Sequence, residues 1–194
     1  MSQEKPPQPS IANRDSKPSF KQRIMETLSP VTDRSFNEYL SHLGLESEDL
    51  SGKIILDIGS GAKERFSKEA EKYGAKVYSI NPKLKSWMAR KELQDSEWQK
   101  RSIAARAQQL PFKDNQFDII TSLYAFPVWF IKKDMAGVLK EMIRVLRPSG
   151  KIYLAPRDDD AEKIFGQDTI EWLRENGCSI NSEQTDKIII TKNE

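Results

Sequence analysis

The residues best placed for chemistry lie in a short turn, Asp57-Ile58-Gly59-Ser60-Gly61. Its two glycines let a ligand approach the backbone, because neither carries a Cβ. A helix that begins just after such a turn offers unpaired N–H groups and a partial positive charge, which suit a carboxylate or a phosphate. The carboxylate of Asp57 adds an anion that can hold an ammonium group. Any tight strand-to-helix turn can use two glycines, so the turn alone indicates a site without identifying its ligand.

The turn follows an apolar run at residues 54–58, and an unbroken run of this kind is typical of a strand buried on both faces of a parallel sheet. Further strands are predicted at residues 76–80, 102–105, 117–122, 151–155, 179–183 and 187–191. Apolar residues at three- and four-residue spacing predict helices at residues 64–73, 83–99, 134–146 and 168–176. An earlier helix is expected to contain Phe36 and Leu43, with Asp33 as its cap and Gly44 at its end.

Strands and helices alternate through most of this order. Parallel strands joined by right-handed crossovers place helices on both faces of a sheet. The predicted fold class is therefore α/β, with a doubly wound, mostly parallel seven-stranded sheet whose last two strands form a hairpin. Ligands of such sheets bind beyond the carboxyl ends of the strands, which is where the glycine turn lies.

Composition excludes several classes of site. The chain has 194 residues and a formal net charge of +2, which gives no strong signal for nucleic acid. Its one cysteine, Cys178, and its one histidine, His42, exclude an internal disulfide framework and a Cys/His zinc cluster. The acidic run Asp158-Asp159-Asp160 can ligate a hard cation, but a solvated loop is the preferred interpretation, and no metal is expected.

The ends of the chain differ in character. Residues 1–19 contain Pro6, Pro7, Pro9 and Pro18 among polar side chains, which predicts a disordered tail. Residues 20–194 are predicted to form one domain. The N-terminus lacks the apolar core of a secretory signal, and no apolar run approaches the roughly 20 residues that cross a bilayer. A cytoplasmic location without a membrane partner is expected.

Three stretches resemble the class I S-adenosylmethionine-dependent methyltransferases. They are IILDIGSG at 54–61, AQQLPFKDNQFDIITS at 107–122 and VLKEMIRVLRPSGKIYLA at 138–155. The resemblance extends over nearly all of residues 36–191, and it is nearest to the small members that lack a large inserted substrate cap. It implies a Rossmann-like fold, S-adenosylmethionine as cofactor and methyl transfer, with a small molecule as the expected acceptor.

The resemblance also implies roles for particular residues. The first turn, with Asp57, Gly59, Ser60 and Gly61, would line the methionine portion of the cofactor, and Asn81 would meet the ribose hydroxyls. The backbone around Ala107 and Gln108 would border the adenine. Residues from Ser122 to Tyr124 would face the methyl group and the acceptor.

Three residues depart from the family pattern: Lys63 replaces a third glycine, Asn81 an acid at the ribose, and Arg106 an acid that accepts from the adenine amino group. An amide offers one acceptor oxygen and an arginine none. Two hypotheses follow. The favoured one is an active methyltransferase with a variant pocket. The alternative is a catalytically inactive protein of the same fold that acts as a binding module or as the partner of an enzyme.

No residue is identified as the general base. His42, on the helix before the first strand, is interpreted as a surface histidine. Tyr124 is equally compatible with facing the acceptor and with packing in the aromatic stretch LYAFPVWF. Methyl transfer from a sulfonium needs mainly alignment, and a base matters only when the acceptor must lose a proton.

Overall fold

A computed structural model describes residues 34–61, 64–82, 101–128, 130, 132–155, 161–182 and 187–194. The predicted tail at 1–19, the predicted helix at 83–99, the acidic run 158–160, Asp33 and Lys63 lie outside these residues. The domain limits therefore stay a prediction.

The described strands form one seven-stranded sheet, in the order β3-β2-β1-β4-β5-β7-β6. The strands are β1 (Ile54–Ile58), β2 (Lys76–Ile80), β3 (Ser102–Ile103), β4 (Phe117–Leu123), β5 (Leu146–Ala155), β6 (Cys178–Asn181) and β7 (Ile188–Lys192). All neighbours from β3 to β5 pair in parallel, whereas β7 is antiparallel to both β5 and β6. The predicted doubly wound sheet with a closing hairpin is confirmed.

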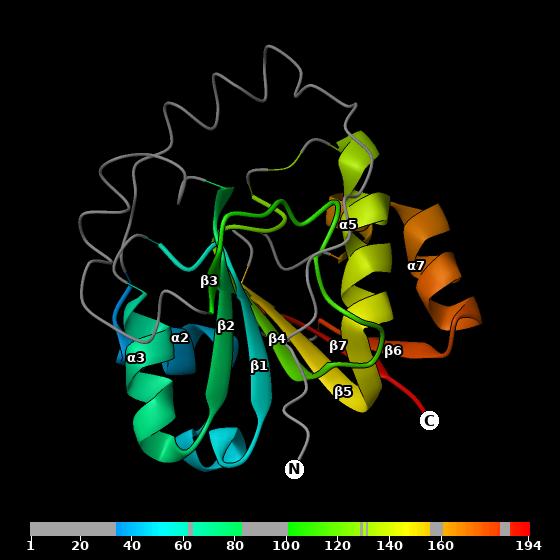
Figure 1. Cartoon of the computed structure of the whole chain (residues 1–194). Coiled ribbons are helices and arrows are strands. Elements are labelled where there is room, and N and C mark those ends of the chain that lie inside the picture. Colours follow the sequence, from blue (N-terminus) through cyan, green and yellow to red (C-terminus); the bar gives the residue numbers. More distant parts are fainter. Residues whose placement is uncertain are drawn as a thin grey trace, which may run out of the picture. The chain divides into compact units, whose positions relative to one another are not determined.

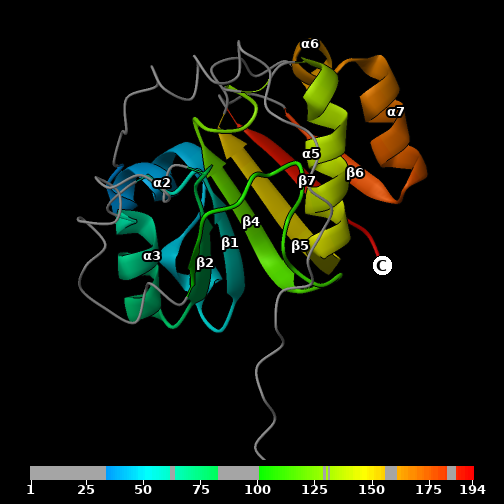
Figure 2. The same ribbon diagram turned by 45° about the horizontal axis from the view of Figure 1, so that its top comes forward.

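Helices cover both faces of this sheet (Figure 1). Those of the described residues are α2 (Phe36–Leu43), α3 (Arg65–Ala70), α5 (Lys132–Val145), α6 (Ala161–Phe165) and α7 (Gln167–Glu175), with 3-10 turns at Ser47–Leu50 and Glu71–Tyr73. In two views α2 and α3 lie on one face, and α5 and α7 lie on the other (Figures 1 and 2).

Each face has its own hydrophobic core. Leu139 and Met142 of α5 pack with Ile120 and Ile152 of the central strands in one core. Neighbouring strand residues point to the other face, where Ile119 joins a core that contains residues of α2 and α3. Because side chains alternate along a strand, consecutive apolar residues such as Ile119 and Ile120 of β4 supply one side chain to each core.

Helix α2 begins and ends at residues that differ partly from prediction. Its N-cap is Ser35, not Asp33: the Ser35 hydroxyl accepts from Glu38 N at 3.3 Å, and Glu38 Oε2 accepts from Ser35 N at 2.7 Å. This capping box satisfies two backbone donors at the helix start. At the other end Gly44 has φ 63°, the left-handed conformation that glycine adopts readily, as predicted.

Two strand boundaries differ clearly from prediction, and one short helix was not predicted. Strand β5 begins at Leu146 rather than at residue 151, because Leu146 pairs with Phe117 ahead of a register shift. Strand β3 has only two residues. The short helix α6 falls where no helix was predicted, since five residues are too few to show a periodicity.

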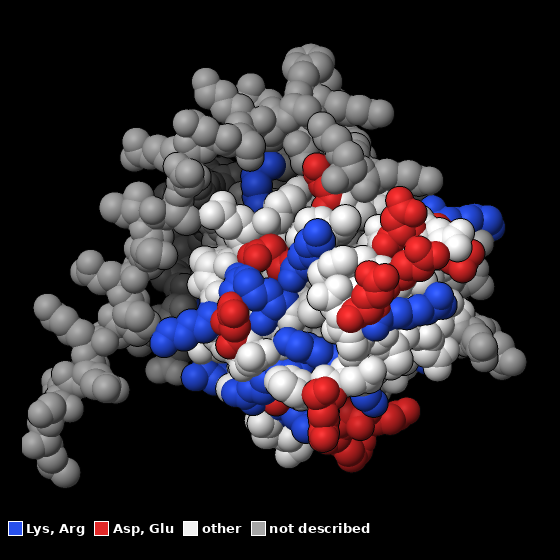
Figure 3. Space-filling view, turned by 90° about the vertical axis from the view of Figure 1, so that its right-hand side faces the viewer, with Lys and Arg blue, Asp and Glu red and all other residues white. Residues whose placement is uncertain are grey.

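The molecular surface over α5 and α7 carries both signs of charge. Lys and Arg lie beside Asp and Glu across this face (Figure 3). Within the described part of the chain, no helix has both the length and the apolar character needed to cross a bilayer.

Candidate active site

The predicted site residues converge because parallel strands end at the same edge of the sheet. Asp57 of β1 lies in register with Ser79 of β2 on one side and with Thr121 of β4 on the other. Asn81 directly follows β2, and Ser122 belongs to the end of β4. The sheet therefore brings together residues that are up to 65 positions apart, because β1 is central and both neighbours run parallel to it.

Asp57 is a fully buried carboxylate with two hydroxyl donors. Thr121 Oγ1 donates to its Oδ1 at 3.1 Å, and the phenol of Tyr39 donates to its Oδ2 at 3.3 Å. Burial raises the pKa of Asp57 to about 7, and the nearby Glu64 raises it too, while the two hydroxyls oppose the shift. A buried anion held by hydroxyls at the end of a central strand is suited to a cationic ligand group.

Gly59 brings the backbone close to the next loop. Its φ is 82°, and its N–H donates to Ile80 O at 2.9 Å. A Cβ placed on this residue would lie 2.2 Å from Cβ of Ala125. Glycine is thus required here both by conformation and by space.

The loop after Gly59 is held from β2. The amide of Asn81 donates from Nδ2 to Gly61 O at 3.2 Å, and the hydroxyl of Ser60 lies 3.5 Å from the same oxygen. Ser60 and Asn81 are both buried. The Nδ2 of Asn81 thus holds the glycine loop from the end of β2.

Glu64 is a second buried carboxyl at this edge, and the sequence did not single it out. It has φ 47°, is 1% exposed, and accepts hydrogen bonds from Ser102 Oγ at 2.5 Å and from Ser60 Oγ at 3.4 Å. Burial raises its pKa. An acid placed directly at the end of the glycine turn is the signal that could have indicated it.

The segment predicted to border an adenine is fixed from α5. Ala107 is buried, Gln108 is half-buried, and Gln109 N donates to Arg106 O at 3.1 Å. Arg144 of α5 donates hydrogen bonds to two backbone carbonyls just after this segment, those of Leu110 and Phe112.

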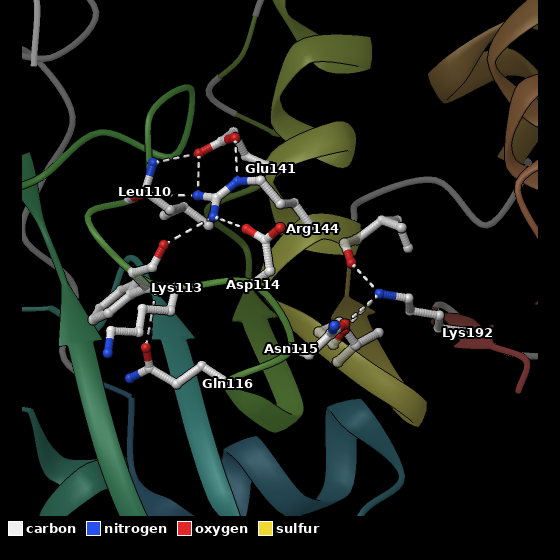
Figure 4. A network of polar contacts seen from close by, with 11 residues as sticks. Leu110, Lys113, Asp114, Asn115, Gln116, Glu141, Arg144 and Lys192 are labelled. Atoms are coloured by element: carbon white, nitrogen blue, oxygen red, sulfur yellow. Dashed lines mark hydrogen bonds and ion pairs between the residues drawn. The ribbon is translucent and has the colours of Figure 1, made fainter.

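Figure 4 shows this clamp, in which Arg144 bonds to Phe112 O at 2.8 Å and to Leu110 O at 3.1 Å. The guanidinium also pairs with Asp114 at 2.8 Å and with Glu141 at 2.8 Å, and Glu141 in turn accepts from Leu110 N at 2.8 Å. A guanidinium is planar and carries five N–H donors, so it can bind several fixed carbonyl and carboxylate oxygens at once.

The end of β4 turns sharply. Ser122 Oγ donates to Ile58 O at 3.1 Å and accepts from Phe126 N at 2.9 Å, so its hydroxyl braces this turn. Tyr124 has φ 55°, a conformation uncommon for a residue other than glycine, and its N–H donates to Ala155 O at 3.1 Å. The role of Ser122 is therefore to shape the loop that presents Tyr124.

Helix α2 reaches the edge at two successive turns. Tyr39 bonds to Asp57, and three residues later His42 Nδ1 lies 3.1 Å from the phenolic oxygen of Tyr124. Residues three apart lie on one face of a helix. His42, interpreted from sequence as a surface histidine, is exposed but pairs with the residue expected to face the acceptor.

Comparison with known proteins gives a consistent result. A family model described as a methyltransferase domain matches residues 56–154. The chain is 25% identical over 185 residues to a demethylmenaquinone methyltransferase of Chlorobaculum tepidum, which covers 85% of this chain and 72% of that one. It is 29% identical over 142 residues to a ubiquinone/menaquinone biosynthesis C-methyltransferase of Shewanella sediminis, covering 68% of this chain. The match spans about half of that relative, 55%.

A similar fold occurs in the PH0226 protein of Pyrococcus horikoshii. Its crystal structure superposes with a TM-score of 0.61 at 20% identity and covers 89% of this chain and 97% of that one. At this identity the likeness concerns the fold.

Proposed function

The chain belongs to the class I S-adenosylmethionine-dependent methyltransferases, and we propose that it binds S-adenosylmethionine at the carboxyl edge of β1, β2 and β4 and methylates a small molecule. The observation that carries the proposal is Gly59, whose positive φ and approach to Ala125 open the backbone beside the buried Asp57. The family match favours an enzyme over the alternative of an inactive binding protein.

The residues at this edge fit the cofactor in chemical terms. Asp57, whose two hydroxyl donors satisfy only part of a carboxylate's acceptor capacity, suits the ammonium group of the methionine portion. The loop from Gly59 to Gly61 lies alongside that portion. Asn81 would offer its acceptor oxygen to the ribose, and Ala107 and Gln108 would border the adenine. The bound cofactor supplies a methyl group already activated by a sulfonium.

The protein's own contribution is alignment. Tyr39 and Thr121 hold Asp57 in one orientation, Ser122 fixes the turn after β4, and Arg144 fixes the loop after β3. Rigid placement of two reacting groups removes much of the entropic barrier of a bimolecular step. These contacts are expected to act through geometry rather than through bonds made or broken.

The relatives indicate the first acceptors to try. The Chlorobaculum tepidum protein is named for demethylmenaquinone and the Shewanella sediminis protein for ubiquinone and menaquinone biosynthesis. We propose a reduced quinone or a related aromatic hydroxyl compound as the acceptor class for this chain.

Calorimetry with S-adenosylmethionine and S-adenosylhomocysteine tests the cofactor site. We expect micromolar binding that Asp57→Asn and Gly59→Ala weaken, and methylation of menadiol detected by mass spectrometry. The control is Tyr73→Phe, a change on the exposed side chain of Tyr73. Binding that is absent or only millimolar contradicts the proposed function.

A further inference from the structure

We propose that Tyr124 and His42 form a proton relay that takes a proton from the acceptor during methyl transfer. The inference deepens the proposed function and rests on it, because it concerns the acceptor side of the same site. It also predicts an acceptor that must lose a proton, such as a phenol, a catechol or an enol.

The geometry of the pair carries the inference. Tyr124 Oη and His42 Nδ1 are 3.1 Å apart, within hydrogen-bond reach, although the two residues are 82 positions apart in the chain. The rings meet edge to face, with centroids 5.3 Å apart and planes at 65°. With the ring proton on Nε2, Nδ1 is the acceptor and the Tyr124 hydroxyl is the donor.

The position of the pair adds to this. Tyr124 directly follows β4, whose Thr121 holds Asp57, so Tyr124 lies on the loop that leaves the same edge of the sheet as the proposed cofactor site. Tyr124 is half-buried against the core below it, and His42 is exposed. One end of the pair therefore meets the acceptor side of the loop, and the other can release a proton to water.

A cation flanks the phenol. The guanidinium of Arg34 lies 5.3 Å from the centroid of the Tyr124 ring and 3.5 Å from Glu38 Oε1. The Nε of Arg34 is buried without a hydrogen-bond partner among the described residues. A guanidinium over the ring is attracted to its face and helps to hold Tyr124 in this orientation.

Other charged groups of the described residues lie on or against helix α2 near His42. Glu38 lies one turn earlier on its own helix, and Lys187 places its ammonium against Gly44, two residues after His42. Asp57 is linked to the same helix face through Tyr39.

The proposed step balances. The acceptor gives its O–H or C–H proton to Tyr124 Oη, and Tyr124 gives its own proton to His42 Nδ1. The electron pair left on the acceptor forms the bond to the methyl carbon, while the pair of the methyl–sulfur bond stays on sulfur. His42 ends as an imidazolium, and the tyrosine ends neutral.

A direct test is NMR of His42, which is the one histidine of the chain and so gives an unambiguous ring signal. We expect its ring nitrogen shifts to show the Nε2–H tautomer with Nδ1 accepting a hydrogen bond, and the Nδ1 shift to move in Tyr124→Phe but not in the control Tyr73→Phe. If the Nδ1 shift is the same in Tyr124→Phe as in the wild type, the relay is wrong. This readout needs no turnover.

The kinetic test compares two acceptors. Catechol must be deprotonated in the site, whereas 4-nitrocatechol is already ionised at pH 8. With catechol, Tyr124→Phe and His42→Gln should lower kcat by about 10²–10⁴-fold, the usual contribution of acid–base catalysis, with little change in KM. With 4-nitrocatechol the loss should stay below about tenfold. Equal losses with both acceptors overturn the relay in favour of a positioning role.

Failure of the proposed function and failure of the relay give different results. If the wild type does not bind S-adenosylhomocysteine, the proposed function fails. If it binds S-adenosylhomocysteine but methylates neither catechol nor menadiol, the acceptor class and the relay fail while the cofactor site stands.

Discussion

Gly59 and Ala125 belong to the turns after β1 and β4, and they meet so closely that a Cβ on the first would lie 2.2 Å from the Cβ of the second. This contact fixes how near the two loops of the site come to each other. It also means that Gly59 resists substitution for two separable reasons, a positive φ and a lack of space.

We expect Gly59→Ala to lose about 1–3 kcal/mol more stability than Gly166→Ala. Gly166 has φ 81°, nearly that of Gly59, but no atom would lie within 4 Å of its added Cβ. With ψ 152°, Gly166 lies in a region that costs other residues about 1–3 kcal/mol, so the control measures a backbone penalty without overpacking, and any loss beyond it measures overpacking. Urea unfolding of both variants checks this, and equal losses would show that Ala125 moves aside without cost.

Asp57 should make stability fall as the pH rises. Its pKa is raised from 3.8 to about 7, so the folded protein keeps a proton that the unfolded chain releases in this window. Folded-state stability is then greatest below about pH 4 for this group and is lost as the pH rises through 7. At about 1.4 kcal/mol per pKa unit, the loss is on the order of 4 kcal/mol at most.

The measurement is urea unfolding at pH 5 and pH 8. Asp57→Asn should flatten the fall between these values and weaken cofactor binding. Glu64, whose pKa burial also raises, keeps part of the slope. Thr121→Val should steepen it, because the Thr121 hydroxyl stabilises the Asp57 anion. A wild-type protein that is more stable at pH 8 than at pH 5 would contradict the assignment.

Asn81→Asp should act in opposite directions on the free and the bound protein. The substitution replaces the Nδ2 donor with an oxygen that faces Gly61 O, so the free protein should lose about 1–2 kcal/mol. A carboxylate accepts the ribose hydroxyls more strongly than an amide does, and affinity for S-adenosylhomocysteine should rise about tenfold. The rise in Tm on adding S-adenosylhomocysteine should thus be larger in the variant. If S-adenosylhomocysteine raises Tm equally in the variant and the wild type, Asn81 does not contact the ribose.

Arg144→Met should weaken cofactor binding without touching the cofactor. It frees the carbonyls of Leu110 and Phe112 and loosens the loop that carries Ala107, so affinity should fall about tenfold. Arg147→Met is the matched control. This variant also breaks an ion pair with an aspartate, Asp118, but within the described part of the chain native Arg147 donates no hydrogen bond to a carbonyl of residues 107–112. Equal cofactor affinity in the two variants would show that the Arg144 contacts do not affect cofactor binding.

The sheet was predictable because its strands are short runs rich in Val, Ile, Leu and Tyr that are bounded by glycine, proline or asparagine, as at residues 54–58 and 76–80. The register Asp57↔Thr121 follows from those runs once the order of strands is known. The predicted start of β5 was wrong because Pro148-Ser149-Gly150 is typical of a turn. In the structure these residues lie within β5, whose first residue, Leu146, pairs with Phe117.

The contacts of the site were less predictable than its members. The turn from Asp57 to Gly61 was found from glycine spacing, and Asn81 from the resemblance to the methyltransferase family. The bond between His42 and Tyr124 joins distant residues through the packing of α2 and shows in no local pattern. Glu64 was overlooked because one of its two hydrogen-bond donors, Ser102, is 38 positions away and reaches it only through the packing of β3.

Helix α2 rests on the proposed donor site through Tyr39 and on the proposed acceptor site through His42, one turn apart. A single rigid body that contacts both sites makes their occupancies thermodynamically linked, since whatever pins one turn of the helix also limits the freedom of the next. Each ligand should then strengthen the binding of the other by the same factor. Helix α2, with eight residues and a capped first turn, would thus couple binding at the cofactor site to binding at the acceptor site.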